Sequence, residues 1–420
     1  MVRRDHNGQL FIENLSVKEL TQIYPTPFYA YSKKQIISNV RKLKQSIQRY
    51  FKKYRIQYPI KANSNPHLLN ILKEEGLGAD CSSPGEIYIA QKVGFPMEKS
   101  TYTGNYESHA DFQAAIQSGI ILNLDDYHRL EEVVSIAKPE LISFRINPGI
   151  GRGGFEGIVT GGTDAKFGIP YEETRTAYQK AMEAGIKRFG IHMMTGSNIL
   201  EPLYFAEITQ KLCAIAGEAL EGLNIRFEFI NIGGGFGIPY TEEEEEIDLD
   251  HTFKLVSEAF YDNVKKYRLG DPELVIEPGR YLVGNAGVLI SRVNHVKKSY
   301  RKFVGLDAGM NTLLRPALYK AYHRILIDGP SKNKKQHYLF TGQVCENSDI
   351  HPGEREYPEI KPGNIAVILD AGAYGFSMCS HYNNRPYPAE VLVDGNSHTL
   401  IRKPESVKDL LRNVPGYQEE

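Results

Sequence analysis

Between Arg55 and Gly279 short apolar runs alternate with amphipathic stretches, and this alternation restricts the possible folds more than any other feature of the sequence. A short apolar run followed by a helical pattern is typical of a βα unit with parallel strands. The candidate strands are IQYPIKA, LGADC, STYT, GIILN, LISFRINPG, KRFGIHMM, FEFINIGGG and ELVIEPG. Eight βα units are the number that closes a (β/α)8 barrel. The sequence therefore predicts an α/β fold built around such a barrel.

The character of the chain changes after the sequence EPGR. Segments rich in β-formers, such as GVLISRVNHVKK, KFVGLDAG and NIAVILDAG, follow one another with Gly and Asp turns and little helix. The early segment PFYAYS is expected to join this second, mainly β domain, because the barrel already has its strands. The predicted division is an N-terminal segment of the β domain (1–32), a barrel (33–283) and a C-terminal β domain (284–420). A chain of 420 residues is long enough for both domains.

Composition excludes several classes of partner. The chain has 50 Lys and Arg against 51 Asp and Glu, so it has no overall field that would attract nucleic acid or an anionic membrane. No apolar stretch approaches about 18 residues, and the N-terminus lacks the apolar core of a signal peptide, so we expect a cytoplasmic protein. The four cysteines form no CxxC pair, which favours reduced thiols over disulfides or a metal site.

Polar residues stand at the predicted strand ends, which is where the chemistry of a (β/α)8 barrel lies. In chain order they are Lys61, Asp80, Arg145, Asn147, His192, Glu277 and Arg280. We expect these side chains to surround one site at the mouth of the barrel.

Glycines follow the last two predicted strands. Gly233, Gly234 and Gly235 come after the seventh strand and Gly279 after the eighth, where backbone N–H groups can approach an anion closely. These two loops are the usual phosphate site of such barrels, and Ser197 could add a hydroxyl. A tight turn would also explain a run of glycines, but the coincidence at both strand ends favours a phosphate.

A lysine, a phosphate site and a nearby carboxylate fit pyridoxal 5'-phosphate better than any other cofactor. The amine of Lys61 can condense with the aldehyde, and Glu277 can pair with the pyridine nitrogen and keep it protonated. The protonated ring then stabilises negative charge at the substrate carbon. The alternatives are that Lys61 is a surface lysine at a strand end and that Glu277 forms an ion pair with Arg280.

Several ordered motifs carry a resemblance to a known family. They are YPIKAN, GADCSSPGEI, KFGI, INIGGGFG, IEPGR, MNTLLRPALYKAYH, VCENSDI and DAGAYGFSMCSHYNNRPYPAEVLVDG. Together they resemble the diaminopimelate decarboxylases and their ornithine/arginine decarboxylase relatives, which are pyridoxal phosphate enzymes of the alanine-racemase-like fold. The likeness runs from about Pro27 to Arg402, and it implies a carboxy-lyase.

The resemblance assigns roles to individual residues. It implies that Lys61 forms the Schiff base, that Glu277 contacts the pyridine nitrogen, and that Cys345 protonates the substrate carbon after CO2 leaves. Around the phosphate it implies Ser197, Gly234, Gly235, Gly279 and Tyr374, and the cofactor site is completed by Asp80, Arg145, His192 and Met194. For the distal end of the substrate it implies Arg280, Arg315, Tyr319, Glu346 and Tyr374. It also implies a head-to-tail homodimer in which the segment CENSD reaches the partner's active site.

Two departures from the family pattern bear on the substrate. The family usually has His-x-His-[Ile/Val]-Gly-Ser at the sixth strand end, whereas this chain reads HMMTGSN and has Met194 where a histidine stacks on the pyridine. The segment RINPGIGRGGFEGIVTGGTDAKFG is also unusually rich in glycine. These features resemble a branch found in secondary metabolism, in particular the butirosin-type L-glutamyl-[acyl-carrier protein] decarboxylase.

Four functions follow as hypotheses. The first is α-decarboxylation of a glutamyl group on an acyl-carrier protein in antibiotic biosynthesis, and the alternative is meso-diaminopimelate decarboxylase, which makes L-lysine. An amino-acid racemase would pair an arginine with the pyridine nitrogen, so Glu277 disfavours it. A non-catalytic carrier of pyridoxal phosphate needs only the barrel, so a long β domain with Cys345 and Tyr374 argues against it.

Overall fold

The computed structural model describes residues 1–153, 161–162, 164–223, 225–329 and 335–418. The chain divides into two compact units, which we call the barrel unit and the β unit. The barrel unit comprises 39–239 and 245–281, and the β unit comprises 1–38, 240–244 and 282–420. Part of the glycine-rich segment that follows Arg145 lies outside the described residues.

The barrel unit contains a closed barrel of parallel strands, so the predicted fold class is confirmed. Each strand pairs with the next around the ring, and the pairs β15–β5 and β8–β9 close it. The strands are β5 (Tyr54–Pro59), β6 (Gly78–Cys81), β7 (Thr101–Tyr102), β8 (Ile121–Leu124), β9 (Leu141–Asn147), β12 (Arg188–His192), β14 (Phe227–Asn231) and β15 (Glu273–Ile276). Because all of these strands are parallel, their carboxyl ends meet at one mouth.

Several strands end earlier than the sequence pattern predicts. β5 stops at Pro59, and Lys61 lies in the 3-10 turn η1 (Ile60–Ala62). The chain leaves the barrel wall here because Asn63 Oδ1 accepts the backbone N–H of Asn65, whose own side chain caps the next helix. β14 likewise stops at Asn231, ahead of the glycine run, and β15 stops at Ile276, just before Glu277.

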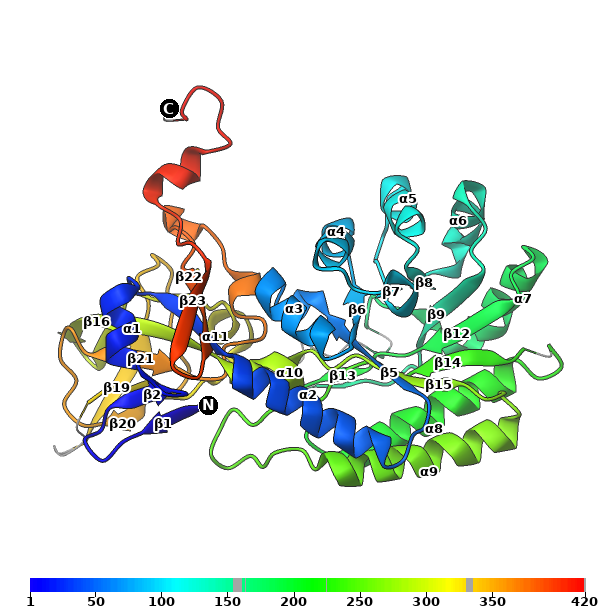
Figure 1. Ribbon diagram of the computed structural model, residues 1–420, viewed down its shortest axis with the longest axis horizontal. Coiled ribbons are helices and arrows are strands. Elements are labelled where there is room, and N and C mark those ends of the chain that lie inside the picture. Colours follow the sequence, from blue (N-terminus) through cyan, green and yellow to red (C-terminus); the bar gives the residue numbers. More distant parts are fainter. Residues whose placement is uncertain (154–160, 163, 224, 330–334, 419–420) are drawn as a thin grey trace. The chain divides into compact units, whose positions relative to one another are not determined.

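Helices cover the outside of the barrel (Figure 1). They are α3 (Pro66–Glu74), α4 (Pro84–Val93), α5 (His109–Ser118), α6 (Leu130–Ile136), α7 (Thr174–Glu183), α8 (Pro202–Ala219) and α9 (Leu249–Tyr267), together with most of α2 (Lys33–Gln48). Ser83, Ser108 and Asp248 cap three of them through side-chain oxygens. Gly94 ends α4 in the left-handed conformation that glycine adopts without strain.

The β unit is built on a sheet in which β4 (Phe28–Ser32) lies between β16 (Gly287–Lys298) and β22 (Ala389–Asp394). The other strands of this sheet are β17 (Lys302–Leu306), β18 (Ile325–Ile327), β19 (Gln336–Thr341), β20 (Arg355–Tyr357), β21 (Ile365–Ile368) and β23 (Ser397–Arg402). Alternate side chains of β4, β16, β21 and β22 pack with Leu10, Val17 and Leu20 into one apolar core. A small sheet, β1 (Val2–Arg4), β2 (Leu10–Ile12) and β3 (Leu15–Ser16), and helix α1 (Val17–Ile23) therefore belong to the same unit.

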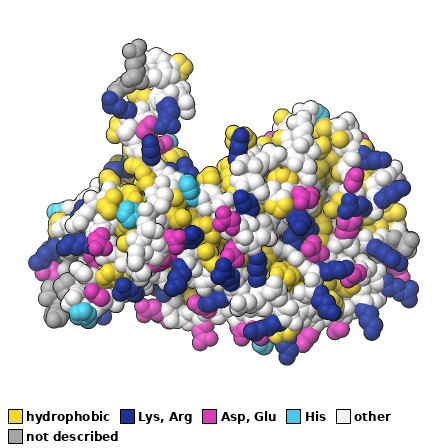
Figure 2. Space-filling view, in the orientation of Figure 1, with side chains coloured by type: hydrophobic (Ala, Val, Ile, Leu, Met, Phe, Trp, Pro, Cys, Tyr) yellow, Lys and Arg dark blue, Asp and Glu magenta, His cyan; other side chains and the backbone are white. Residues whose placement is uncertain are grey.

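Basic and acidic side chains are interspersed on the face drawn in Figure 2, in keeping with the net charge of −1. Among the described residues, we find no helix with the length and apolar character needed to span a membrane.

Candidate active site

Lys61 and Asp80 face each other at the mouth of the barrel. Lys61 Nζ lies 2.9 Å from Asp80 Oδ2. The lysine side chain is 48% exposed, whereas the aspartate side chain is only 3% exposed. The amine is therefore oriented by a buried carboxylate and remains accessible to a ligand, which differs from a lysine that extends freely into solvent.

Glu277 is buried and is held from two sides. Asn231 Nδ2 donates a hydrogen bond of 2.6 Å to one carboxylate oxygen, and His192 Nε2 lies 3.3 Å from the other. His192 Nδ1 is 3.0 Å from Asn123 Nδ2, and an amide nitrogen only donates. His192 Nδ1 is therefore the acceptor, so the ring carries a hydrogen on Nε2, facing Glu277.

The two carboxylates at the mouth differ in pKa. Burial raises the pKa of Asp80, and the charge of Glu277 raises it further, although Lys61 acts in the opposite sense. Burial also opposes ionisation of Glu277, but its contacts with His192 and Asn231 and the charge of Lys61 outweigh burial and lower its pKa. Glu277 is therefore the carboxylate that stays ionised, as a partner for a protonated pyridine nitrogen must.

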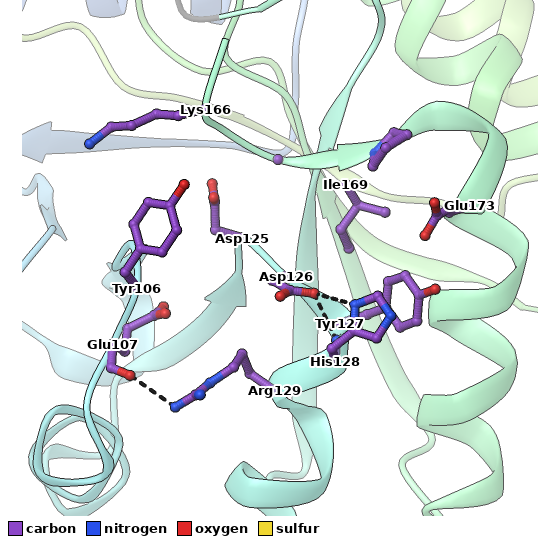
Figure 3. A pocket seen from close by; sticks show the side chains of 12 residues that line it. Tyr106, Glu107, Asp125, Asp126, Tyr127, His128, Arg129, Lys166, Ile169 and Glu173 are labelled. Carbon is purple, nitrogen blue, oxygen red and sulfur yellow. Dashed lines mark hydrogen bonds and ion pairs between the residues drawn. The ribbon is translucent and has the colours of Figure 1, made fainter. Parts of the chain in front are cut away.

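Arg145 lies on β9 and is buried at the same mouth. Its guanidinium stands 3.4 Å from Asp125 and 4.4 Å from the ring centre of Phe167. Asp125 also lines a cavity of about 520 Å³, around which Figure 3 shows Tyr106 and Lys166. Arg145 is thus held by a carboxylate that lines this cavity, whereas Lys61 is not among the residues that line it.

The glycine run forms a cradle that larger residues would fill. Gly233 and Gly235 have φ values of +73° and +95°, and a Cβ on Gly234 would lie 2.3 Å from the carbonyl oxygen of Glu277. The N–H of Gly234 donates to Met194 Sδ at 3.1 Å. A thioether is a weak hydrogen-bond acceptor. The N–H of Gly234 can therefore donate to an anion instead with little loss of free energy.

Cationic and hydroxyl groups lie beside this cradle. Arg280 Nη2 donates to Ser197 Oγ at 3.2 Å, and a Cβ on Gly235 would lie 3.0 Å from the carbonyl oxygen of Gly196. The residues present therefore fit the phosphate of pyridoxal phosphate: a close backbone, a hydroxyl and a guanidinium, with Lys61 and Glu277 at the same mouth.

Five other predicted residues belong to the β unit, namely Arg315, Tyr319, Cys345, Glu346 and Tyr374. Arg315 begins the short helix α11 (Arg315–Tyr319) and is 2% exposed. Cys345 and Glu346 are exposed, and the backbone N–H of Cys345 donates to Asn383 Oδ1 at 2.6 Å. Tyr374 is half-buried, with a φ of +56°.

Sequence reasoning missed several residues that hold the predicted ones in place. Asn123 and Asn231 orient His192 and Glu277 from inside the apolar strands β8 and β14. An amide inside an apolar strand needs a buried partner, and this signal could have pointed to both. Tyr240 and His323, which contact Arg315, carry no comparable local signal.

Comparison with known proteins identifies the family. Residues 34–284 match the family described as "Pyridoxal-dependent decarboxylase, pyridoxal binding domain". The diaminopimelate decarboxylase of Methanothermobacter thermautotrophicus is 43% identical over 413 residues, which cover 97% of this chain and 96% of that protein.

Solved structures give the same result. The diaminopimelate decarboxylase of Methanocaldococcus jannaschii in complex with L-lysine has a TM-score of 0.89 at 31% identity, covering 99% of this chain and 98% of that one. The enzyme of Helicobacter pylori, also with L-lysine, has a TM-score of 0.86 at 35% identity, covering 94% and 98%.

These relatives do not support the butirosin-type branch that the sequence suggested, and they favour the diaminopimelate decarboxylases instead. The prediction of a pyridoxal phosphate-dependent carboxy-lyase is confirmed. The chain belongs to the family of pyridoxal-dependent decarboxylases.

Proposed function

We propose that the protein decarboxylates meso-diaminopimelate to L-lysine. The observation that carries the proposal is the joint presence of an oriented, accessible Lys61 and a buried Glu277 of lowered pKa at one barrel mouth. The choice of substrate is supported by relatives that are named diaminopimelate decarboxylases and that align over nearly the whole chain.

The protein's own groups have separable tasks in this reaction. Bound pyridoxal phosphate supplies an aldehyde and an electron-withdrawing ring. Lys61 presents the amine that reacts with the aldehyde, and Asp80 orients that amine. Glu277 holds a proton at the pyridine nitrogen, while Asn231 and His192 keep its carboxylate in place and ionised.

The phosphate would be held at the cradle of Gly233–Gly235. The N–H of Gly234, the hydroxyl of Ser197 and the guanidinium of Arg280 supply donors and positive charge there. Gly279, which follows Glu277, is buried and leaves room for a close approach of the backbone. This assignment gives Arg280 a task at the phosphate in addition to the substrate role that the sequence suggested.

Residues of the β unit would recognise the distal end of the substrate. Arg315 suits a carboxylate, Tyr319 adds a hydroxyl and Glu346 suits an amine. Cys345 would protonate the substrate carbon after CO2 leaves, which is worth roughly 10²–10⁴-fold in rate. Its exposure fits the proposed homodimer, in which this loop reaches the partner's active site.

The acyl-carrier hypothesis rested in part on Met194, and the structure gives this residue another explanation. Its sulfur accepts the N–H of Gly234, so it is a packing and hydrogen-bonding partner of the glycine cradle. A carrier-bound substrate is not needed to account for it.

One experiment separates the two substrates. The purified protein with pyridoxal phosphate is supplied with free meso-diaminopimelate, or with a glutamyl-loaded acyl-carrier protein, and released CO2 is measured. We expect turnover of the free diacid and none of the loaded carrier. CO2 from the loaded carrier alone would overturn the proposal in favour of the first hypothesis.

A further inference from the structure

Arg315 is a buried cation whose surroundings in the β unit fix its position. It stands at the start of α11 and is 2% exposed. Its Nη1 lies 2.7 Å from His323 Nε2, and its guanidinium carbon lies 4.6 Å from the ring centre of Tyr240. Both neighbours are themselves buried, so the guanidinium meets two side chains that cannot move away readily.

The partners of His323 dictate its protonation. A guanidinium can only donate, so Nε2 of His323 must accept from Arg315. The other ring nitrogen, Nδ1, lies 2.8 Å from the carbonyl oxygen of Leu369, which can only accept. Nδ1 therefore carries the hydrogen, and the geometry requires the neutral ring with its hydrogen on Nδ1. A proton on Nε2 would turn the contact with Arg315 into a clash of two donors.

Tyr240 restrains the guanidinium in a second direction. The ring centres of Tyr240 and His323 are 5.3 Å apart and the ring planes are inclined at 76°. Tyr240 therefore presents its ring face to Arg315, and His323 presents its ring nitrogen Nε2. A cation over an aromatic face is attracted without a covalent or ionic partner. The two rings together therefore define both the depth and the direction of the guanidinium.

A second arginine of the β unit shows what is particular about this arrangement. Arg324 lies 2.8 Å from the carboxylate of Asp370, which supplies a full negative charge. His323 is a neutral acceptor, and it orients Arg315 without adding a compensating charge. His323 and Tyr240 thus orient Arg315 without contributing a charge of their own, and the charge of Arg315 also acts on Asp370, where it opposes the rise in pKa that burial causes.

We propose that His323 and Tyr240 are positioning residues that aim Arg315 at the carboxylate that the substrate keeps. This inference rests on the proposed function, which assigns Arg315 to that carboxylate. When one carboxylate leaves diaminopimelate, the other remains on the product, L-lysine. L-lysine and 1,5-diaminopentane share their two amines and carbon chain but differ in this carboxylate, so they form a matched pair of probes.

The test measures inhibition by these two amines in the complete enzyme with pyridoxal phosphate, together with kcat and KM for meso-diaminopimelate. In His323→Phe we expect KM and the inhibition constant of L-lysine to rise about 10-fold, as for the loss of one charge-assisted hydrogen bond. The inhibition constant of 1,5-diaminopentane and kcat should stay within about 2-fold. His323→Gln, whose side-chain oxygen can accept from Arg315, should recover part of the loss.

His351→Phe is the matched control, because His351 is another buried histidine of the β unit. It should leave the ratio of the two inhibition constants unchanged. An equal rise in the inhibition constants of both amines in His323→Phe would overturn the inference. A general loss of structure would weaken binding of both amines alike, whether or not they carry a carboxylate. If His323→Phe does not fold, Tyr240→Leu must give the same selective loss, and an unchanged ratio in that variant would equally overturn it.

Arg315→Met separates this inference from the proposed function. A selective loss of L-lysine inhibition in Arg315→Met, with no effect of His323→Phe or Tyr240→Leu, would overturn only the positioning role. No selective loss in Arg315→Met would instead remove the assignment of Arg315 to the retained carboxylate, and with it part of the proposed function.

Discussion

Asp80 and Glu277 are both buried carboxylates at the mouth of one barrel, yet their pKa values shift in opposite directions. Burial disfavours ionisation of both. Asp80 has one cationic partner, and that lysine is about half exposed. Glu277 has a buried imidazole and a buried amide on its two oxygens. The comparison shows that the number of partners and the burial of those partners decide which carboxylate stays charged. Burial of the carboxylate itself does not decide it, because both carboxylates are buried.

The largest expected effect concerns Lys61, which lies 2.9 Å from Asp80 and whose charge helps to lower the pKa of Glu277. Lys61→Ala should abolish decarboxylation and the visible absorbance of the bound cofactor, because no other residue has been assigned the amine that condenses with the aldehyde. Absorbance spectra of the purified variant with added pyridoxal phosphate check this. Survival of the wild-type band would contradict the assignment of Lys61.

The second prediction sets the two carboxylates against each other. Glu277→Gln should lower kcat by about 10²-fold or more, as for the loss of one preorganised electrostatic contact. Asp80→Asn should cost about 10-fold or less, because an amide oxygen can still accept from Lys61. Steady-state kinetics on both variants decide the matter, and equal losses would show that the difference in pKa has no catalytic meaning.

His192→Phe should sharpen the contrast by making Glu277 resemble Asp80. Burial would then act on Glu277 with less opposition, so its pKa should rise. Because the ionised form is needed at the pyridine nitrogen, the acid limb of the kcat profile should move to higher pH. A profile from the lowest pH at which both proteins stay folded up to pH 9 tests this, because the wild-type pKa of about 2 places its limb at low pH. A limb that does not move would mean that His192 has no influence on Glu277.

The smallest effect concerns stability. The pKa of Asp80 is raised above 3.8 in the folded protein, so folding binds protons there and the buried charge costs stability as pH rises above that value. Glu277 has a lowered pKa, so its contribution is present above 4.5 and is lost as pH falls. Asp80→Asn should therefore raise the melting temperature by a few degrees at pH 7 and by less near pH 4. Thermal denaturation at the two pH values measures this, and a larger gain at pH 4 would contradict the stated sign.

The sequence predicts the barrel, Lys61 and Glu277 because these depend on local patterns: apolar runs, strand ends and glycines. It predicts strand ends less well, since the turn at Asn63 depends on side-chain hydrogen bonds that an apolar pattern does not reveal. The amides that hold His192 and Glu277 come from other strands of the ring. The contact of Tyr240 with Arg315 joins residues that are far apart in the sequence, and tertiary structure alone brings them together.

The position of β4 has a consequence for biosynthesis. Tyr31 pairs with Gly287 and Phe28 with Ala389, so a strand synthesised before the barrel waits for partners synthesised after it. The barrel strands are complete by Ile276, and this unit can close while the ribosome is still at work. The nascent chain must meanwhile keep the apolar residues 28–32 from pairing elsewhere, because the loop that joins them to their final neighbours spans the whole barrel.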